Sequence, residues 1–174
     1  MKTLGCLLVI LIISNLAYAE PISLKEGKVK FETPKGFKEL SREQILLKFP
    51  RANPPSKAYG NENLEVSISI VFSPENLSEA QLIELKSSLE QTFPRLIPNL
   101  VWKKREMIKV KGTIWVHFEF SSTAISNNAD IHNNIYITSF EGKMLSFNFN
   151  STKKQYKKYS TALIKSFESI AISK

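Results

Sequence analysis

The chain has only two histidines, and any metal-binding or acid–base site would have to be built around them. His117 and His132 could bind a metal ion together with Asp130 or Glu119, because imidazole and carboxylate groups are ordinary zinc ligands. The spacing argues against this interpretation, since the sequence has no helical His-x-x-x-His pair and no cluster of ligands. We therefore expect no metal site and no cofactor.

A serine hydrolase is the second chemistry that the side chains allow. Ser121 or Ser122 could form a triad with Asp130 and His132, since triads are defined by geometry and not by order in the chain. However, the sequence has no Gly-x-Ser-x-Gly nucleophile turn. Its six glycines are too scattered for a phosphate-binding loop. We expect no catalytic residue.

Basic residues gather in two places. Residues 102–106 read Trp-Lys-Lys-Arg-Glu, and Lys153, Lys154, Lys157 and Lys158 share one side of the last predicted helix. The formal net charge of +8 suits an anionic lipid, an anionic glycan or an acidic protein. A solvated basic surface is the alternative, and the aromatic residues favour it because most are spaced as core residues. No nucleic-acid partner is expected.

The first nineteen residues have the three parts of a secretory signal peptide. Lys2 is followed by the apolar stretch Leu4–Leu16 and by a small-x-small cleavage site that ends at Ala19. We expect cleavage after Ala19, a periplasmic or secreted product with a net charge of about +7, and no transmembrane segment. Cys6 raises the alternative of a lipoprotein, but a lipid-acceptor cysteine follows its apolar stretch, whereas Cys6 precedes most of it.

Residues 20–174 are the size of a single domain with a full hydrophobic core, and they contain no cysteine for a disulfide. Three segments have helical patterns that begin with a Ser or Thr cap followed three positions later by Gln. These helices are predicted over 40–50, 78–94 and 152–170, the first two ending at prolines.

Six segments have strand patterns, most clearly 66–72 and 114–120, where apolar and polar residues alternate. The others are 28–31, 100–110, 131–139 and 144–150. Lys111-Gly112 and Glu141-Gly142 predict tight turns that join the later strands as antiparallel hairpins. The order of helices and strands predicts an α+β fold. We interpret Trp115 as a core residue, with an exposed contact in an open groove as the alternative.

Two stretches follow neither period and are predicted to be loops, 51–63 and 121–130. Long loops on a rigid frame commonly carry binding residues. The candidates are Arg51, Lys57, Tyr59, Asn127 and Asp130. Tyr59 could anchor a protein interface or could pin its loop to the sheet, and the sequence does not separate these two roles.

The order of several short motifs resembles that of the PsbP/DcrB-like superfamily. These motifs are Val29-Lys-Phe-Glu-Thr-Pro-Lys-Gly-Phe37, the Ser-Pro-Glu-Asn-Leu-Ser segment at 73–78, Val110-Lys-Gly-Thr-Ile-Trp115 and Phe140-Glu-Gly-Lys-Met-Leu-Ser-Phe147. The resemblance covers residues 28–172 and implies an α/β/α sandwich built on an antiparallel sheet. It also implies a family of largely non-enzymatic members without a shared catalytic motif.

These patterns predict an exported, non-enzymatic module that binds another protein through its loops or an exposed sheet surface, as an effector-binding, immunity or envelope accessory protein. The alternative is an exported enzyme that acts on envelope polymers, with the loop carboxylates Glu62, Glu65 and Asp130 as acid and base. A cleft with paired carboxylates would favour the enzyme.

Overall fold

The computed structural model describes residues 21–50, 53–124 and 129–173. The predicted signal peptide and two candidate binding residues, Arg51 and Asn127, lie outside these described ranges. No helix within the described ranges is long and apolar enough to span a bilayer.

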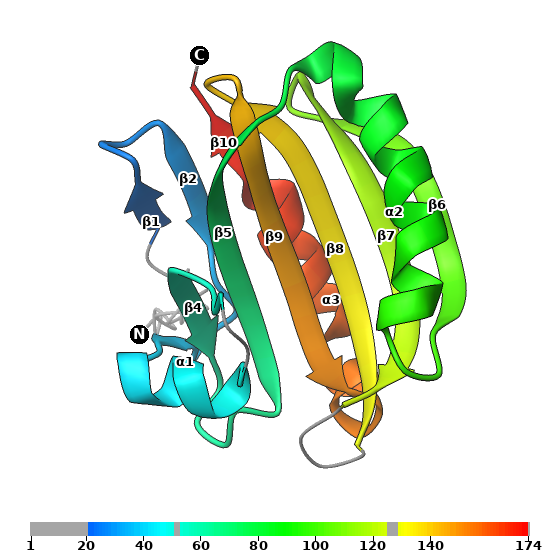
Figure 1. The fold of residues 1–174 in the computed structure, drawn as a ribbon. Coiled ribbons are helices and arrows are strands. Elements are labelled where there is room, and N and C mark those ends of the chain that lie inside the picture. Colours follow the sequence, from blue (N-terminus) through cyan, green and yellow to red (C-terminus); the bar gives the residue numbers. More distant parts are fainter. Residues whose placement is uncertain (1–20, 51–52, 125–128, 174) are drawn as a thin grey trace, which may run out of the picture.

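A seven-stranded sheet forms the centre of the molecule, and a three-stranded sheet lies beside it (Figure 1). The strand orders are β3-β4-β5-β9-β8-β7-β6 and β1-β2-β10, and all neighbouring strands are antiparallel. The strands are β1 (Pro21–Leu24), β2 (Val29–Glu32), β3 (Lys38–Glu39), β4 (Lys57–Gly60), β5 (Val66–Asn76), β6 (Val101–Val110), β7 (Thr113–Thr123), β8 (Asp130–Phe140), β9 (Lys143–Thr152) and β10 (Ala171–Ile172). The helices are α1 (Arg42–Lys48), α2 (Leu82–Leu96) and α3 (Lys153–Ser169), with a short 3-10 helix, Glu79–Gln81, before α2.

The α+β class, the antiparallel sheet and the three helices are confirmed. All six predicted strands are present, and the main sheet has seven strands where about six were expected; the short strands β1, β3, β4 and β10 were not predicted. The prediction of a continuous loop over 51–63 is wrong at its centre. There Lys57–Gly60 forms β4, which pairs with β5 so that Tyr59 lies opposite Ile68.

The polar residues that predicted the helix starts make the expected contacts in α1 and α3. Ser41 Oγ accepts from the Gln44 N–H at 3.2 Å, and Thr152 Oγ1 accepts from the Gln155 N–H at 3.4 Å. The predicted end of the second helix at Pro94 is wrong, because α2 continues to Leu96. Proline removes its own N–H donor and crowds the carbonyl four residues earlier, but the next turn still closes, since the Ile97 N–H bonds to the Phe93 carbonyl at 2.8 Å.

The two predicted tight turns are confirmed as two-residue connections. Lys111 and Gly112 have φ angles of 47° and 83°, and Val110 pairs directly with Thr113. Glu141 and Gly142 have φ angles of 52° and 74° and join β8 to β9 in the same way. Positive φ at both central residues matches the twist of antiparallel hairpins.

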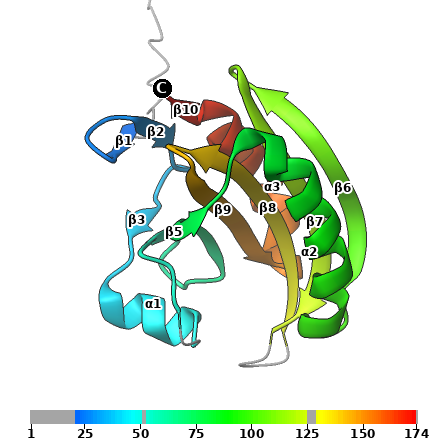
Figure 2. The same ribbon diagram turned by 45° about the horizontal axis from the view of Figure 1, so that its top comes forward.

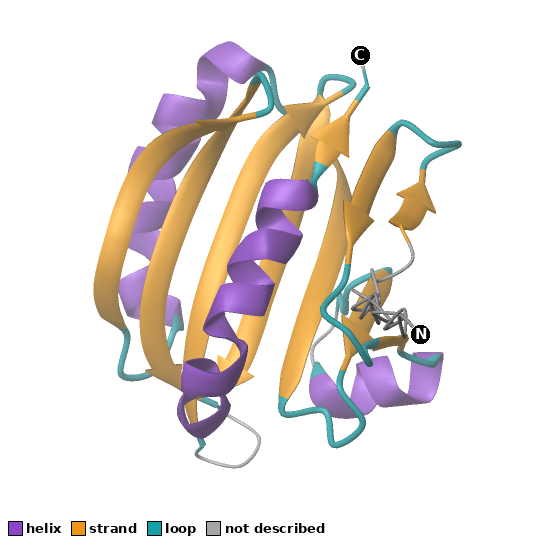
Figure 3. Ribbon diagram, turned by 180° about the vertical axis from the view of Figure 1, so that it is seen from behind, coloured by secondary structure: helices purple, strands orange, loops and turns teal. Residues whose placement is uncertain are grey.

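One face of the large sheet is covered by α3, as Figure 3 shows from behind. Leu163 and Phe167 of α3 are buried against this face, and the Phe167 ring lies 5.6 Å from the Trp115 ring. Trp115 is 1% exposed, so its predicted core position is confirmed. This layer includes the aromatic residues Phe147 and Phe149 of β9.

The opposite face is only half covered. There α2 packs on β6 and β7, where Phe93 of α2 lies 5.5 Å from the ring of Phe118. The strands β5, β9 and β8 have no helix over them on this side, and α1 and α2 lie to either side (Figures 1 and 2). This uncovered half of the sheet is where the candidate site lies.

Candidate functional site

The uncovered half of the sheet carries a cluster of amide and hydroxyl side chains. In the register of the sheet, Ser67 of β5 pairs with Asn150 of β9, and Asn150 pairs with Asn133 of β8. One step along, Ser69 pairs with Asn148. Directly paired residues project from the same face, so these five side chains form one polar surface. This polar surface lies on the same face of the sheet that α2 covers, because Asn133 pairs directly with Phe120, which is buried under α2.

A hollow of about 730 Å³ lies over this polar surface. We call it the asparagine groove, with Asn133, Asn148 and Asn150 as its floor, residues 47–50 as one wall and residues 96–98 as the other. The walls are the ends of α1 and α2, which stop on opposite sides of the open strands. Loop residues such as Leu64 and Ala124 complete the lining.

The floor is held by a chain of side-chain hydrogen bonds. Asn150 Nδ2 donates to Asn133 Oδ1 at 2.8 Å, and Asn133 Nδ2 donates to Ser122 Oγ at 3.2 Å. Two further buried atoms, Ser67 Oγ and Asn148 Oδ1, have no hydrogen-bond partner within the described residues. A buried polar atom without a partner costs about 1–3 kcal/mol. The floor carries no formal charge, and one of its acceptors, Asn148 Oδ1, is unused within the described residues.

Carboxylates lie at one end of the groove. Glu65 lines it and also lines a smaller adjoining hollow together with Asp130, Lys153 and Lys154, whereas Glu62 lines neither hollow. Glu65 Oε2 accepts from Gln155 Nε2 at 2.7 Å, and Asp130 Oδ2 lies 3.7 Å from Lys153 Nζ. The structure thus brings together two of the three carboxylates, each already in contact with a neighbour. Asp130 was predicted to lie in a loop, but it is the first residue of β8, because β7 and β8 extend into the predicted loop 121–130.

Solved structures with the same architecture cover nearly the whole chain. Cyanobacterial PsbP from Synechocystis superposes with a TM-score of 0.63 at 11% identity, over 98% of this chain and 99% of that one. The chain has the PsbP-like fold. LpqN of Mycobacterium tuberculosis, described as involved in cell envelope biogenesis, gives a TM-score of 0.60 at 11% identity, over 88% of this chain and 90% of its own.

A Pseudomonas aeruginosa protein of unknown function matches with a TM-score of 0.54 at 13% identity, over 88% of this chain and 96% of its own. No family model matches the sequence, and no curated protein sequence is significantly similar to it. The similarity is therefore one of architecture, and the functional site has to be inferred from the residues of this protein.

In this PsbP-like fold, the candidate residues Lys57 and Tyr59 lie on β4 and not in a loop. Tyr59 is buried, its ring lies 5.6 Å from that of Phe31, and its hydroxyl donates to Glu39 Oε2 at 3.4 Å. Burial raises the pKa of Tyr59 to about 12. An interface anchor needs an accessible ring, so this position fits the role of pinning the segment to the sheet. Lys57 forms an ion pair with Glu39.

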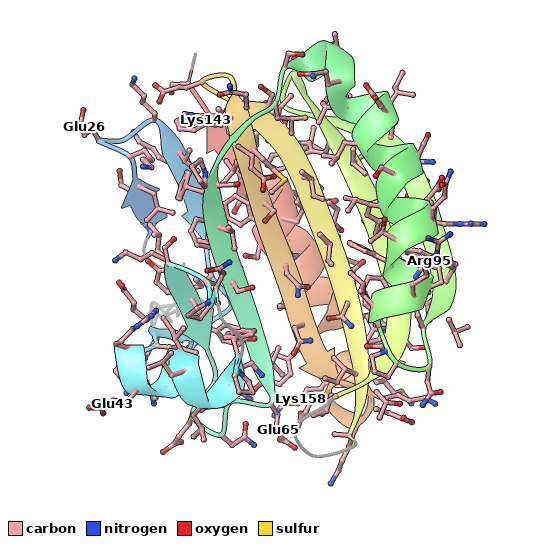
Figure 4. All side chains as sticks on the ribbon, in the orientation of Figure 1. Glu26, Glu43, Glu65, Arg95, Lys143 and Lys158 are labelled. Atoms are coloured by element: carbon pink, nitrogen blue, oxygen red, sulfur yellow. The ribbon has the colours of Figure 1, made fainter. Side chains whose placement is uncertain are left out.

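The predicted basic patch is exposed on the first two turns of α3. Lys153, Lys154, Lys157 and Lys158 project away from the side of the helix that packs on the sheet. Lys158 and Glu65 lie at the same end of the PsbP-like fold, where β5 and α3 begin (Figure 4). The attraction of this basic patch to an anionic partner stays a prediction.

The two histidines lie on the sheet face that α3 covers, each with partners of its own. His117 Nδ1 lies 3.0 Å from Glu106 Oε1, and its Nε2 lies 3.1 Å from Asn134 Oδ1. His132 Nε2 lies 3.1 Å from Glu119 Oε1. Within the described residues, no group of three or more potential ligands is placed to hold a metal ion.

Ser121 pairs directly with His132 and projects from the same face, but neither ring nitrogen of His132 has a serine hydroxyl as its partner within the described residues. The Nδ1 atom of His132 lies 3.2 Å from Lys103 Nζ, so the neighbours of the ring nitrogens are a lysine and a glutamate. Ser122 faces the opposite side of the sheet, where its hydroxyl accepts from Asn133. Within the described residues, the imidazole therefore contacts a lysine and a glutamate and forms no hydrogen bond to a serine hydroxyl.

Acid should destabilise the protein through His132. Burial and the nearby Lys103 lower the pKa of His132 to about 4, and Glu119 only partly opposes them. In the unfolded chain the pKa returns to about 6.5. The unfolded chain therefore binds the extra proton first, and stability falls as the pH decreases from about 6.5 to 4. Tyr156, stacked on the ring, adds no charge in this range.

Urea unfolding at pH 7 and pH 4.5 tests this expectation. The wild type should lose more stability on acidification than His132→Gln, which has no imidazole to protonate. If the two proteins lost the same free energy of unfolding between pH 7 and pH 4.5, groups other than His132 would cause the acid sensitivity.

Proposed function

We propose that this chain is an exported, non-enzymatic binding module whose asparagine groove binds a segment of another protein. The observation that carries the proposal is the pair of exposed leucines on opposite walls of the groove. Leu47 at the end of α1 is 74% exposed, and Leu96 at the end of α2 is 69% exposed. Large apolar side chains exposed around a cleft are typical of binding surfaces.

The floor of the groove suits a polypeptide. Asparagine side chains both donate and accept hydrogen bonds, as peptide groups do. A segment lying in the groove would place apolar side chains against Leu47 and Leu96 and polar groups on Asn133, Asn148 and Asn150. This division between apolar contacts and a few placed polar groups is common in ligand sites.

Export rests on the signal-peptide pattern of residues 1–19. The likeness to LpqN, which is described as involved in cell envelope biogenesis, supports a place in the cell envelope. The partner would then be another exported or envelope protein, so that this chain acts as an effector-binding, immunity or accessory protein.

The enzymatic alternative rests on one observation, the presence of Glu65 and Asp130 in the same hollow. Both carboxylates already contact neighbours within the chain, through Gln155 and Lys153. A general acid and base need to reach the substrate instead. Binding is therefore the function that this geometry supports better.

Site-specific photo-crosslinking in the producing cell tests the proposal. A photoreactive residue at position 47 or 96 should capture the same partner, because both positions face the groove. Positions 83 and 164 are matched controls, since Ile83 and Ile164 are also exposed but do not line the groove. Capture at the controls alone, or equally at all four positions, would reject the groove as the binding site.

A further inference from the structure

A lysine lines the asparagine groove without a carboxylate to pair with. Lys48 Nζ donates to the Leu64 carbonyl at 2.5 Å and lies 5.8 Å from the centre of the Phe49 ring. No carboxylate of the described residues comes within 4.0 Å of it in an ion pair. An ammonium group has three donors, so Lys48 keeps hydrogen-bonding capacity toward the groove.

The environment of Lys48 is unfavourable to its charge in the free protein. Burial lowers the pKa of Lys48 to about 8, and the more distant Glu65 only partly compensates. A partly buried charge that lacks a partner is costly, and an anion placed beside it would offset that cost. The simplest group to supply this anion is a carboxylate of whatever occupies the groove.

The adjoining hollow carries charges of both signs. Its two carboxylates, Glu65 and Asp130, contact Gln155 and Lys153 inside the chain. Lys154 also lines this hollow and forms no ion pair with the described residues. The groove and its continuation are lined by three lysines, Lys48, Lys153 and Lys154, and by two carboxylates, Glu65 and Asp130, which leaves one positive charge in excess. Lys48 and Lys154 are the two lysines of this lining that form no ion pair with the described residues.

We propose that the protein segment bound in the asparagine groove is acidic, with carboxylates that pair with Lys48 and Lys154. This inference rests on the proposed function and names the chemistry of its partner. A second copy of this chain is a poor candidate, since its formal net charge of +8 would be repelled. The neutral floor hydrogen-bonds to the backbone or amide groups of the segment, and the two lysines favour a segment with negative charge.

An eight-residue glutamate peptide is a direct probe, with an eight-residue glutamine peptide as its neutral match. The wild type should bind the glutamate peptide at least ten times more tightly in calorimetry at low salt. Lys48→Met and Lys154→Met should each weaken that binding several-fold. Lys165→Met removes the same charge from the exposed side of α3, away from the groove, and should change the affinity less than twofold.

Two further measurements separate the role of charge from a loss of folding. Lys48→Arg keeps the charge and should retain binding, whereas Lys48→Met should not, at equal melting temperatures. In the wild type, the pKa of Lys48 followed by NMR should rise above about 8 when the glutamate peptide is bound.

Equal weakening by all three lysine-to-methionine changes would overturn the inference, since it would show general attraction to a basic protein. Equal affinity for the two peptides would also overturn it. The proposed function would survive either result if crosslinks at positions 47 and 96 persist. The protein could instead bind vesicles of phosphatidylglycerol and phosphatidylcholine, and Lys48→Met could weaken that binding as much as it weakens peptide binding. That result would mean that the lysines bind a lipid surface, and it would reject the acidic protein segment.

Discussion

Replacing Phe167 with alanine is expected to lower the free energy of unfolding by about 3–5 kcal/mol. Phe167 is 3% exposed and lies between α3 and the sheet, with its ring against those of Trp115, Tyr136 and Phe149. Alanine would remove the aromatic surface from this layer and leave a cavity that the surrounding strands cannot close, because their positions are fixed by hydrogen bonds on both sides.

Ile164 provides the matched control on the same helix. It is 46% exposed, so Ile164→Ala should lower the free energy of unfolding by less than about 1 kcal/mol. Both values come from urea unfolding followed by circular dichroism. Similar losses for the two variants would mean that α3 does not pack on the sheet through the Phe167 side.

The longer elements could be predicted from the sequence because each carries its own local signal. Ser41 and Thr152 cap helices by accepting from backbone N–H groups only three residues further along the chain. Strands β5 and β7 alternate apolar and polar residues over enough positions for the period of two to be recognised. Their order along the chain then limited the fold to an antiparallel α+β arrangement.

The short strands β1, β3, β4 and β10 could not be predicted because partners elsewhere in the chain stabilise β4 and β10, and β1 and β3 have only four and two residues. β4 has only four residues, Lys57–Gly60, and it lies in a segment with two prolines and a glycine. It becomes a strand because β5 offers unpaired backbone groups beside it. β10 depends in the same way on β2, which lies more than a hundred residues earlier.

The groove was missed for a related reason. Asn148 and Asn150 alternate with Phe147 and Phe149, so the sequence already shows that one face of β9 is polar. What it does not show is that α2 stops short of this face and leaves it open. That follows from the packing of α2 on β6 and β7, which depends on contacts such as Phe93 with Phe118.

The two exposed leucines are expected to dominate the binding energy of the groove. Burying a leucine against a partner contributes about 1.5–3 kcal/mol, and an aspartate in its place would have to be desolvated. The double change Leu47→Asp and Leu96→Asp should therefore weaken partner binding at least a hundredfold, about 2.7 kcal/mol. Both side chains are exposed in the free protein, so its stability should not change by more than about 1 kcal/mol.

The most direct test of the binding role is the affinity of this double variant for the crosslinked partner, measured beside a control with the same number of new charges. Ile83→Asp combined with Ile164→Asp provides that control, because both isoleucines are exposed and lie outside the groove. We predict a loss of at least a hundredfold for the leucine pair and less than threefold for the isoleucine pair. Unchanged affinity in the leucine variant, or equal losses in the two, would contradict the assignment of the asparagine groove as the binding site.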